Sequence, residues 1–313
     1  NYENFIYHKY LFNRLNLNIS YPISKFSRVE ISPFFATYKF NDLDYRIFNN
    51  TPPPFSFYEK DNFYGYFFNF KFDNIKNISS NLEEGTKIHL SFKNYISNNN
   101  SSNNFKNLSL DVAHHQKISE NLFFASKIFY GNSFGNNPFK YFLGGVKNSI
   151  SNTSDDKGIN DPLLVVNGYN NNNFIFGEYI NLRGYNFNKF DGYKVLVLNS
   201  ELRVPLVKFI SGKNASSSFL NSLQFVGFFD LGSSWNINSP FSKNNDVNTW
   251  IIKEPGSVFQ AEIENSKNPW LASYGFGLRS FITDYYIKLD IAKPIEDYQI
   301  GNTKYHISFG YSF

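Results

Sequence analysis

The sequence predicts an all-β protein, an antiparallel transmembrane β-barrel of the outer-membrane type, on three observations. Aromatic rings supply most of the apolar mass, with 37 Phe and 22 Tyr in 313 residues, and aromatic residues favour strands over helices. The mean hydropathy is negative, and no apolar run reaches the roughly 18 residues that a membrane helix needs. Many segments alternate apolar and polar residues with period two, as barrel strands do when one face meets lipid and the other the lumen.

Six strand candidates lie in the N-terminal half of the chain, at residues 15–19, 27–40, 64–72, 88–92, 108–112 and 122–128. Segment 64–72 shows the alternation clearly, because Tyr64, Phe68 and Phe72 share one face. Asn69 and Lys71 share the other face. Segment 27–40 alternates less well than the others.

Five more candidates lie at residues 196–204, 223–229, 274–282, 285–291 and 305–313. In the last of these, the odd-numbered residues from Tyr305 to Phe313 are all apolar, and the even-numbered ones are polar or glycine. The total of about eleven strands is odd, whereas single-chain bacterial barrels have an even number. We therefore expect N-terminal strands to be absent and these residues alone to form an open sheet.

A soluble β-sandwich would also alternate with period two, so the composition of the two faces decides between the folds. Large aromatic residues follow one another on the apolar face, which suits lipid, and the charged residues keep to the other face. Asn and Ser tracts at 97–104, 149–173 and 236–268 indicate long solvated loops, whereas turns such as 297–301 are short. These features favour one barrel domain over residues 1–313.

Enzymatic and nucleic-acid functions are not expected. The chain has no Cys, and its net charge of +4 is spread along the sequence rather than concentrated in a basic patch. The five histidines are scattered without metal-ligand spacing, and no nucleophile elbow or phosphate-binding glycine loop occurs; they are His8, His89, His114, His115 and His306. We expect no catalytic residues, no cofactor and no metal.

The beginning of the chain indicates a mature piece or a fragment of a longer protein. The whole sequence contains no Met, and Asn1 is not followed by a signal-peptide pattern. We expect a soluble region to precede the barrel in the complete protein.

A motif in the long central loop narrows the prediction. Leu182-Arg183-Gly184-Tyr185 precedes Gly192, and the next strand candidate contains Glu201 in the stretch Glu-Leu-Arg-Val-Pro. Phe228-Phe229-Asp230-Leu231-Gly232 follows. A guanidinium inside a lumen needs a carboxylate, and Asp230 lies on the polar face of its strand, so we predict that Arg183 pairs with Asp230. The alternative is an exposed loop arginine without a fixed partner.

In order and spacing, these motifs resemble those of the outer-membrane assembly barrels of the BamA and TamA superfamily, also called bacterial surface antigens. The resemblance runs from about Leu11 to the C-terminus and implies a sixteen-stranded barrel with a loop inserted into the lumen. It implies structural or functional roles for Leu182, Arg183, Gly184, Tyr185, Glu201, Asp230, Gly232 and Phe313. The terminal Phe313 is expected to help the assembly machinery to recognise the protein. The long insertion between Gly145 and Leu182 is similar to that of Bacteroidota relatives.

Three functions follow from the resemblance, all in the outer membrane of a Gram-negative bacterium or, as an alternative, of an organelle. The first is insertion of other outer-membrane proteins through a weak seam between the first and last strands, where a client strand adds by β-augmentation. The second is a pore that exports a polypeptide through the lumen. The third is a membrane anchor for a soluble domain. The expected partners are membrane lipid, unfolded or secreted polypeptide clients, and accessory lipoproteins or periplasmic domains, since these residues contain no POTRA repeats.

Overall fold

A computed structural model describes residues 5–45, 59–79, 82–151, 176–212, 217–253, 260–264, 267–282 and 285–310. Its main feature is a 14-stranded antiparallel sheet. The sheet follows the order β1 (Phe5–Asn16), β3 (Ser27–Tyr45), β4 (Glu59–Asp73), β6 (Leu82–Ser97), β7 (Phe105–Ser119), β8 (Leu122–Gly135), β12 (Lys194–Pro205), β13 (Gln224–Trp235), β16 (Leu271–Ile282), β17 (Tyr285–Glu296) and β18 (Gln299–Ile300). Three more strands pair beside this path: β19 (Lys304–Phe309) with β17, β2 (Ile19–Pro22) with β3, and β5 (Lys76–Ser79) with β6.

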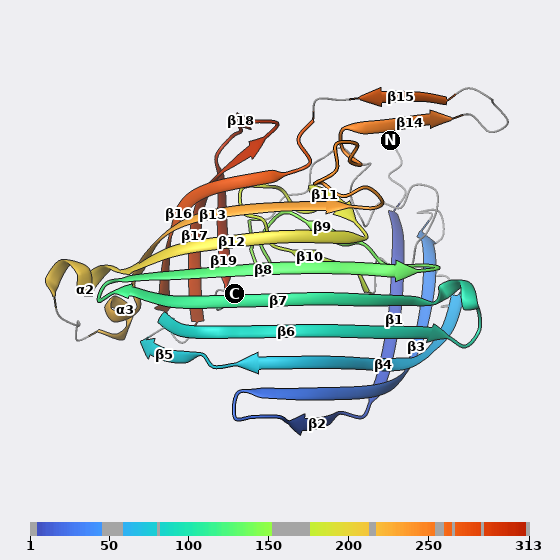
Figure 1. The fold of residues 1–313 in the computed structure, drawn as a ribbon, viewed down its shortest axis with the longest axis horizontal. Helices are drawn as coiled ribbons and strands as arrows, with labels where there is room; N and C mark the ends of the chain where they lie inside the picture. The colour runs from blue at the N-terminus through green and yellow to red at the C-terminus, as the bar shows by residue number, and fades with distance from the viewer. Residues whose placement is uncertain are drawn as a thin grey trace.

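The sheet curves like the wall of a barrel. In Figure 1, the strands from β4 to β13 cross the front, whereas β1 and β3 at one side and β17 and β19 at the other stand behind them at a steep angle. Within the described residues, β1 and β19 do not pair with each other, so the wall is open between them. The predicted fold class and the expected open sheet are both confirmed.

The connections contain little further regular structure. They hold the short helices η1 (Ser101–Asn103), α2 (Leu206–Ser211) and α3 (Ser218–Ser222), and the hairpin of β14 (Thr249–Lys253) and β15 (Gln260–Glu264). None of the described helices is both long and apolar enough to cross a bilayer.

Ten of the eleven strand candidates correspond to single strands of the main sheet, although residues 311–313 of the candidate at 305–313 lie outside the described part of the chain. The candidate at 15–19 is wrong in its bounds. It spans the end of β1 and the start of β2. The interruption lies opposite Pro33 of β3, whose carbonyl accepts a hydrogen bond from the Leu17 N–H at 3.1 Å. Pro33 has no N–H to return, so the ladder is broken at this point.

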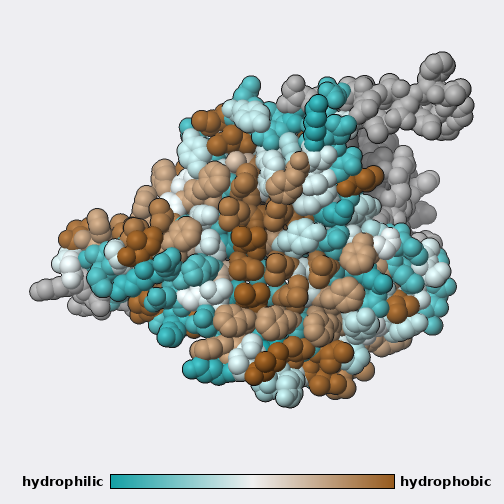
Figure 2. Space-filling model, viewed as in Figure 1, coloured by the Kyte–Doolittle hydropathy of each residue, from teal (hydrophilic) through white to brown (hydrophobic). Residues whose placement is uncertain are grey.

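The two faces of the sheet have the predicted composition along the strands that follow the central loop. In β12, Asn199, Glu201 and Arg203 are buried on the inner face, while Leu202 is 47% exposed on the outer face. Figure 2 shows apolar residues grouped in a band across the outer face. A continuous exposed apolar surface of this kind indicates a membrane-facing wall.

Part of the inner face is apolar, which the alternation did not predict. An aromatic cluster lies there, with Tyr95 stacked on Phe105 at 4.5 Å between ring centroids and Phe34 stacked on Phe67 at 4.7 Å. Phe176, from the segment between β8 and β12, packs on Tyr95 at 4.8 Å. This cluster also accounts for the poor alternation of segment 27–40, because β3 carries apolar residues on both faces there.

Candidate functional site

The connection between β8 and β12 folds onto the concave side of the sheet, and its described residues 136–151 and 176–193 are called the inserted loop below. Its three short strands form a small sheet, in which β9 (Tyr141–Leu143) lies between β10 (Glu178–Ile180) and β11 (Phe190–Gly192). Leu182 is fully buried, and its N–H donates to the Gly145 carbonyl at 3.0 Å. Leu182 thereby fixes the loop backbone immediately before Arg183.

Arg183 is buried against the inner wall and pairs with Asp230 of β13. Its Nε lies 2.7 Å from Asp230 Oδ2 and its Nη2 lies 2.6 Å from Oδ1, which is the two-pronged geometry that a guanidinium and a carboxylate favour. The guanidinium carbon also lies 3.8 Å from the centre of the Phe228 ring, in a cation–π arrangement. The predicted pairing of Arg183 with Asp230 is confirmed.

Glu201 of β12 is the second partner of Arg183. Its Oε1 lies 2.6 Å from Arg183 Nη1, and its Oε2 accepts from Arg203 Nε at 2.8 Å. Arg279 Nη2 of β16 lies 3.6 Å from the same carboxylate. Arg279 also pairs with Asp290 of β17 at 2.7 Å.

These six buried residues, Arg183, Glu201, Arg203, Asp230, Arg279 and Asp290, form what is called the charged cluster below. It contains three arginines and three acids, so its formal charges balance. Burial of an ion is costly unless it is paired, and here each carboxylate lies beside at least one guanidinium. The cluster joins the inserted loop to four neighbouring strands of the wall.

The electrostatic surroundings keep Arg183 charged. Burial by itself lowers the pKa of a guanidinium, because the charged form loses its hydration. The adjacent carboxylates of Asp230 and Glu201 outweigh this effect and raise the pKa of Arg183 above its ordinary value. The guanidinium of Arg183 therefore stays protonated.

The tip of the inserted loop contacts the C-terminal strands of the sheet. The Gly184 N–H donates to His306 Nε2 of β19 at 3.0 Å, and the Tyr185 hydroxyl lies 2.8 Å from the Ala272 carbonyl and 2.7 Å from that of Ile295. Gly184 has a φ of +84°, and a Cβ there would lie 3.1 Å from Ser273 Cβ, so only glycine fits without strain.

Gly232 has a packing role in the same region. A Cβ at this position would lie 3.1 Å from Val197 Cγ2 and 3.3 Å from Leu143 Cδ2. The absent side chain thus lets β9 of the inserted loop approach β13 closely.

The structure brings together seven of the eight residues that the sequence motifs selected, and Phe313 lies outside the described residues. Sequence reasoning missed Arg203, Arg279, Asp290, Phe228 and His306 as partners. All except Phe228 occupy polar positions in strands whose residues alternate between apolar and polar. This alternation was the signal in the sequence that could have indicated them. What the sequence could not supply was which polar positions of different strands meet under the loop.

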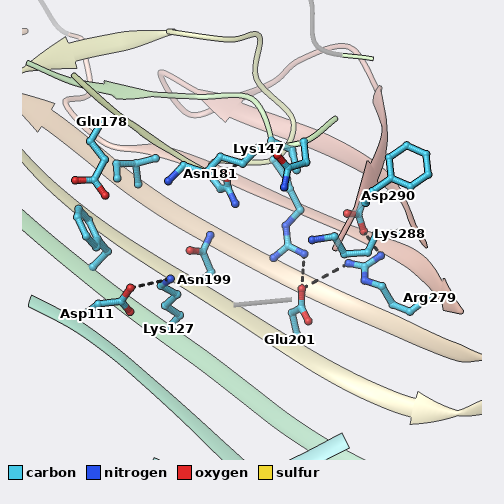
Figure 3. Close-up of a pocket in the computed structure, with 16 residues that line it drawn as sticks. Asp111, Lys127, Lys147, Glu178, Asn181, Asn199, Glu201, Arg279, Lys288 and Asp290 are labelled. Atoms are coloured by element: carbon cyan, nitrogen blue, oxygen red, sulfur yellow. Dashed lines mark hydrogen bonds and ion pairs between the residues drawn. The ribbon is translucent and has the colours of Figure 1, made fainter. Parts of the chain in front are cut away.

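A cavity of about 280 Å³ lies between the inserted loop and the wall (Figure 3). Charged side chains of both signs line it, including Lys288 and the Lys127–Asp111 pair at 2.9 Å. Within the described residues, no three His, Asp or Glu side chains come together as metal ligands.

An antiparallel wall that is apolar outside and charged inside, with a loop held against its inner face, defines an outer-membrane β-barrel. Residues 164–313 match the family model described as the Omp85 superfamily domain. Residues 164–313 thus carry an Omp85 superfamily domain, and the resemblance proposed from the motifs is confirmed. The predicted location in the outer membrane of a Gram-negative bacterium is also confirmed.

A solved structure shows the same fold. The structure of BamA from Haemophilus ducreyi lacking POTRA domains 1–3 matches with a TM-score of 0.58 and 13% identity, over 97% of this chain and 55% of that one. CdiB from Acinetobacter baumannii matches with a TM-score of 0.48 and 11% identity, over 97% and 42% of the two chains, and CdiB from Escherichia coli with 0.48 and 10%, over 96% and 45%. The chain thus spans little more than half the length of the BamA structure. No curated protein sequence matches this chain.

Proposed function

We propose that this chain is the non-enzymatic barrel part of a machine that inserts other β-barrel proteins into the outer membrane. The observation that carries the proposal is the edge strand β19. Within the described residues, its ladder with β17 joins six residue pairs, from Ile287 with Phe309 to Ala292 with Lys304, whereas β12 and β13 share twelve. An edge strand presents one row of backbone groups away from the sheet, where another strand can pair, and a six-pair ladder has fewer hydrogen bonds than a twelve-pair one.

A client strand can pair with such an edge through its backbone alone. β-Augmentation needs no nucleotide, metal or cofactor, and alternate side chains of the added strand meet lipid and lumen in the same register as the host strand. The exposed outer side chains Tyr305 and Ile307 continue the lipid-facing surface to this edge. The proposed clients are unfolded outer-membrane proteins, assisted by membrane lipid and by accessory lipoproteins or periplasmic domains.

The contents of the concave side argue against export of a polypeptide through the lumen. Export would require the inserted loop to leave, which breaks the pairs of Arg183 with Asp230 and Glu201. Breaking a buried ion pair by removal of one partner costs about 3–5 kcal/mol. Opening at the edge strand leaves both pairs in place, so insertion is favoured over translocation.

The test uses liposomes that contain the complete protein, with a urea-unfolded outer-membrane barrel as the probe. The folding rate of the probe is read from its heat-modifiable band. The Ile307 N–H donates to Ser151 Oγ at 3.0 Å and therefore points away from β17. Ile307→Pro removes this N–H, and Ile307→Val keeps it. We expect faster probe folding than in empty liposomes, with the acceleration lost in Ile307→Pro and kept in Ile307→Val. Equal rates with and without the protein would contradict insertion, and protease-protected probe inside the liposomes would support export.

A further inference from the structure

A segment of the inserted loop, Asn148–Ser151, lies along the edge of β19 that faces away from β17, and it is called the edge segment below. The Ile150 N–H donates to the Ile307 carbonyl at 3.0 Å, and the Phe309 N–H donates to the Asn148 carbonyl at 3.3 Å. Ser149 stands opposite Ser308 in an antiparallel bridge. The edge segment therefore occupies the place of a neighbouring strand.

The Ser151 side chain extends this pairing by one more position. Its hydroxyl donates to the Tyr305 carbonyl at 3.0 Å and accepts from the Ile307 N–H at 3.0 Å. Together with the two backbone bonds, the edge segment satisfies the Tyr305 carbonyl, the N–H and carbonyl of Ile307, and the Phe309 N–H. These are the groups that an incoming strand needs for β-augmentation.

The edge segment is continuous with the part of the inserted loop that carries Arg183. A turn bonds the Ser149 N–H to the Val146 carbonyl at 3.2 Å, and the Lys147 N–H donates to Asn181 Oδ1 at 2.8 Å. Two residues earlier in the chain, Gly145 forms a bridge with Leu182. The position of the edge segment therefore depends on that of the loop.

The contact with β19 is suited to release. Ile150 is 72% exposed, so its side chain adds little packing against the wall. What remains is a small set of hydrogen bonds, each with a modest net contribution because water replaces it on opening. A strand with more backbone partners can displace the edge segment.

We propose that Asn148–Ser151 is a built-in strand mimic that covers the outer edge of β19 and competes with an extended polypeptide strand for the same backbone groups. This inference rests on the proposed function for the identity of the competitor, an unfolded outer-membrane protein. That the edge segment occupies the outer edge of β19 follows from the contacts above and does not depend on the proposed function.

A disulfide between Ser149→Cys and Ser308→Cys tests the position. The sequence contains no cysteine, so the pair is formed without competitors from this chain. Residues opposed in an antiparallel bridge have Cα atoms close enough for a disulfide. We expect oxidation of the complete protein in membranes to give an intramolecular disulfide. Ile237→Cys with Ser308→Cys, which uses an exposed residue of another loop, should remain reduced. Equal yields in the two variants would overturn the proposal.

The competition is tested with Ile150→Pro combined with Ser151→Ala, which removes three of the hydrogen bonds to β19 and leaves β19 unchanged. Ile237→Pro is the control, since it also removes one backbone donor, to Asp246 Oδ2, in an exposed loop. The probe is a fluorescent peptide with the sequence of residues 304–310, and the readouts are its affinity and the hydrogen exchange of β19. We expect affinity to rise by about tenfold or more in the double variant. We expect faster exchange at β19 in this variant, no change in the control, and loss of peptide binding in the disulfide form.

The outcomes separate the two proposals. Unchanged exchange and unchanged peptide affinity in the double variant would overturn the edge segment as a cover, whatever the protein does. Faster exchange without peptide binding would support the cover and contradict strand pairing at β19, and with it the proposed function. If the double variant fails to fold, the disulfide yield in the otherwise unchanged protein still decides the position.

Discussion

Arg183 meets three different partners with one planar group, and this explains why the position requires arginine. The guanidinium forms two bonds to Asp230, one to Glu201, and stacks on the Phe228 ring. An ammonium group is a point charge that cannot form the same paired bonds or stack in the same way. The chemistry of one side chain thus fixes the loop to two strands at once.

Removal of Arg183 should strongly loosen the inserted loop. Arg183→Ala leaves Asp230 and Glu201 buried with fewer partners, and we expect a local cost of about 3–5 kcal/mol. Asp230→Ala should have a similar effect, while the double substitution should cost less than the sum because the two residues are directly coupled. Proteolysis of the inserted loop measures each cost, and strict additivity would contradict the coupling. Lys127→Ala, at a less buried ion pair with Asp111, is the control.

A second prediction at the residue scale concerns Gly131 of β8. A Cβ there would lie 2.4 Å from the ring of Tyr141 in the inserted loop, whereas a Cβ at Gly227 of β13 meets no atom within 4 Å. We therefore expect Gly131→Ala to destabilise the protein by about 1–3 kcal/mol through overpacking. Gly227→Ala should change stability little. Thermal unfolding in detergent measures both, and equal midpoints would show that Tyr141 does not rest on the wall.

At the scale of the strand, the alternation assigns each side chain to lipid or to the lumen. Phe276 of β16 is 50% exposed on the outer face, and Leu198 of β12 points the same way, so arginine at either position should cost about 2–4 kcal/mol near the bilayer midplane. The neighbouring Asn199 lines the charged cavity, so Asn199→Arg should be milder. Folding into liposomes from urea provides the comparison. Similar costs on both faces would contradict the lipid-facing assignment.

Strands were predictable because their signal is local, whereas the contents of the concave side depend on which distant segments meet. Period two by itself assigns Glu201, Asp230 and Arg279 to the inner face. It could not show that β6 and β7 bury aromatic side chains under Phe176, because an apolar inner residue looks the same in sequence as an outer one. Nor could it place Asn148–Ser151 beside β19, since that contact joins a polar loop to a strand more than 150 residues later.

At the scale of the whole molecule, one connected path joins the charged cluster to the sheet edge. Arg183 holds the loop to β12 and β13, the Leu182–Gly145 bridge carries this position to the next part of the loop, and Asn148 reaches β19. The Gly184 bond to His306 is a second connection between the same two sites. The inner wall and the edge strand are therefore parts of one packed unit.

This path predicts that a change in the charged cluster alters the edge strand at a distance. Asp230→Ala removes the two-pronged partner of Arg183 without touching β19, so the inserted loop should move more freely and carry the edge segment away from Ile307. We expect faster hydrogen exchange of residues 304–310 in the complete protein in membranes, since the amides of Ile307 and Phe309 then lose their acceptors.

Asp111→Ala is the matched control, because Asp111 lines the same cavity and also loses an ion pair, but its partner Lys127 belongs to β8 and not to the inserted loop. Exchange at β19 should be unchanged in this variant. If both substitutions accelerated exchange equally, the effect would be a general loss of stability. If neither did, the loop and the edge would be independent, and the edge segment would be held by β19 alone.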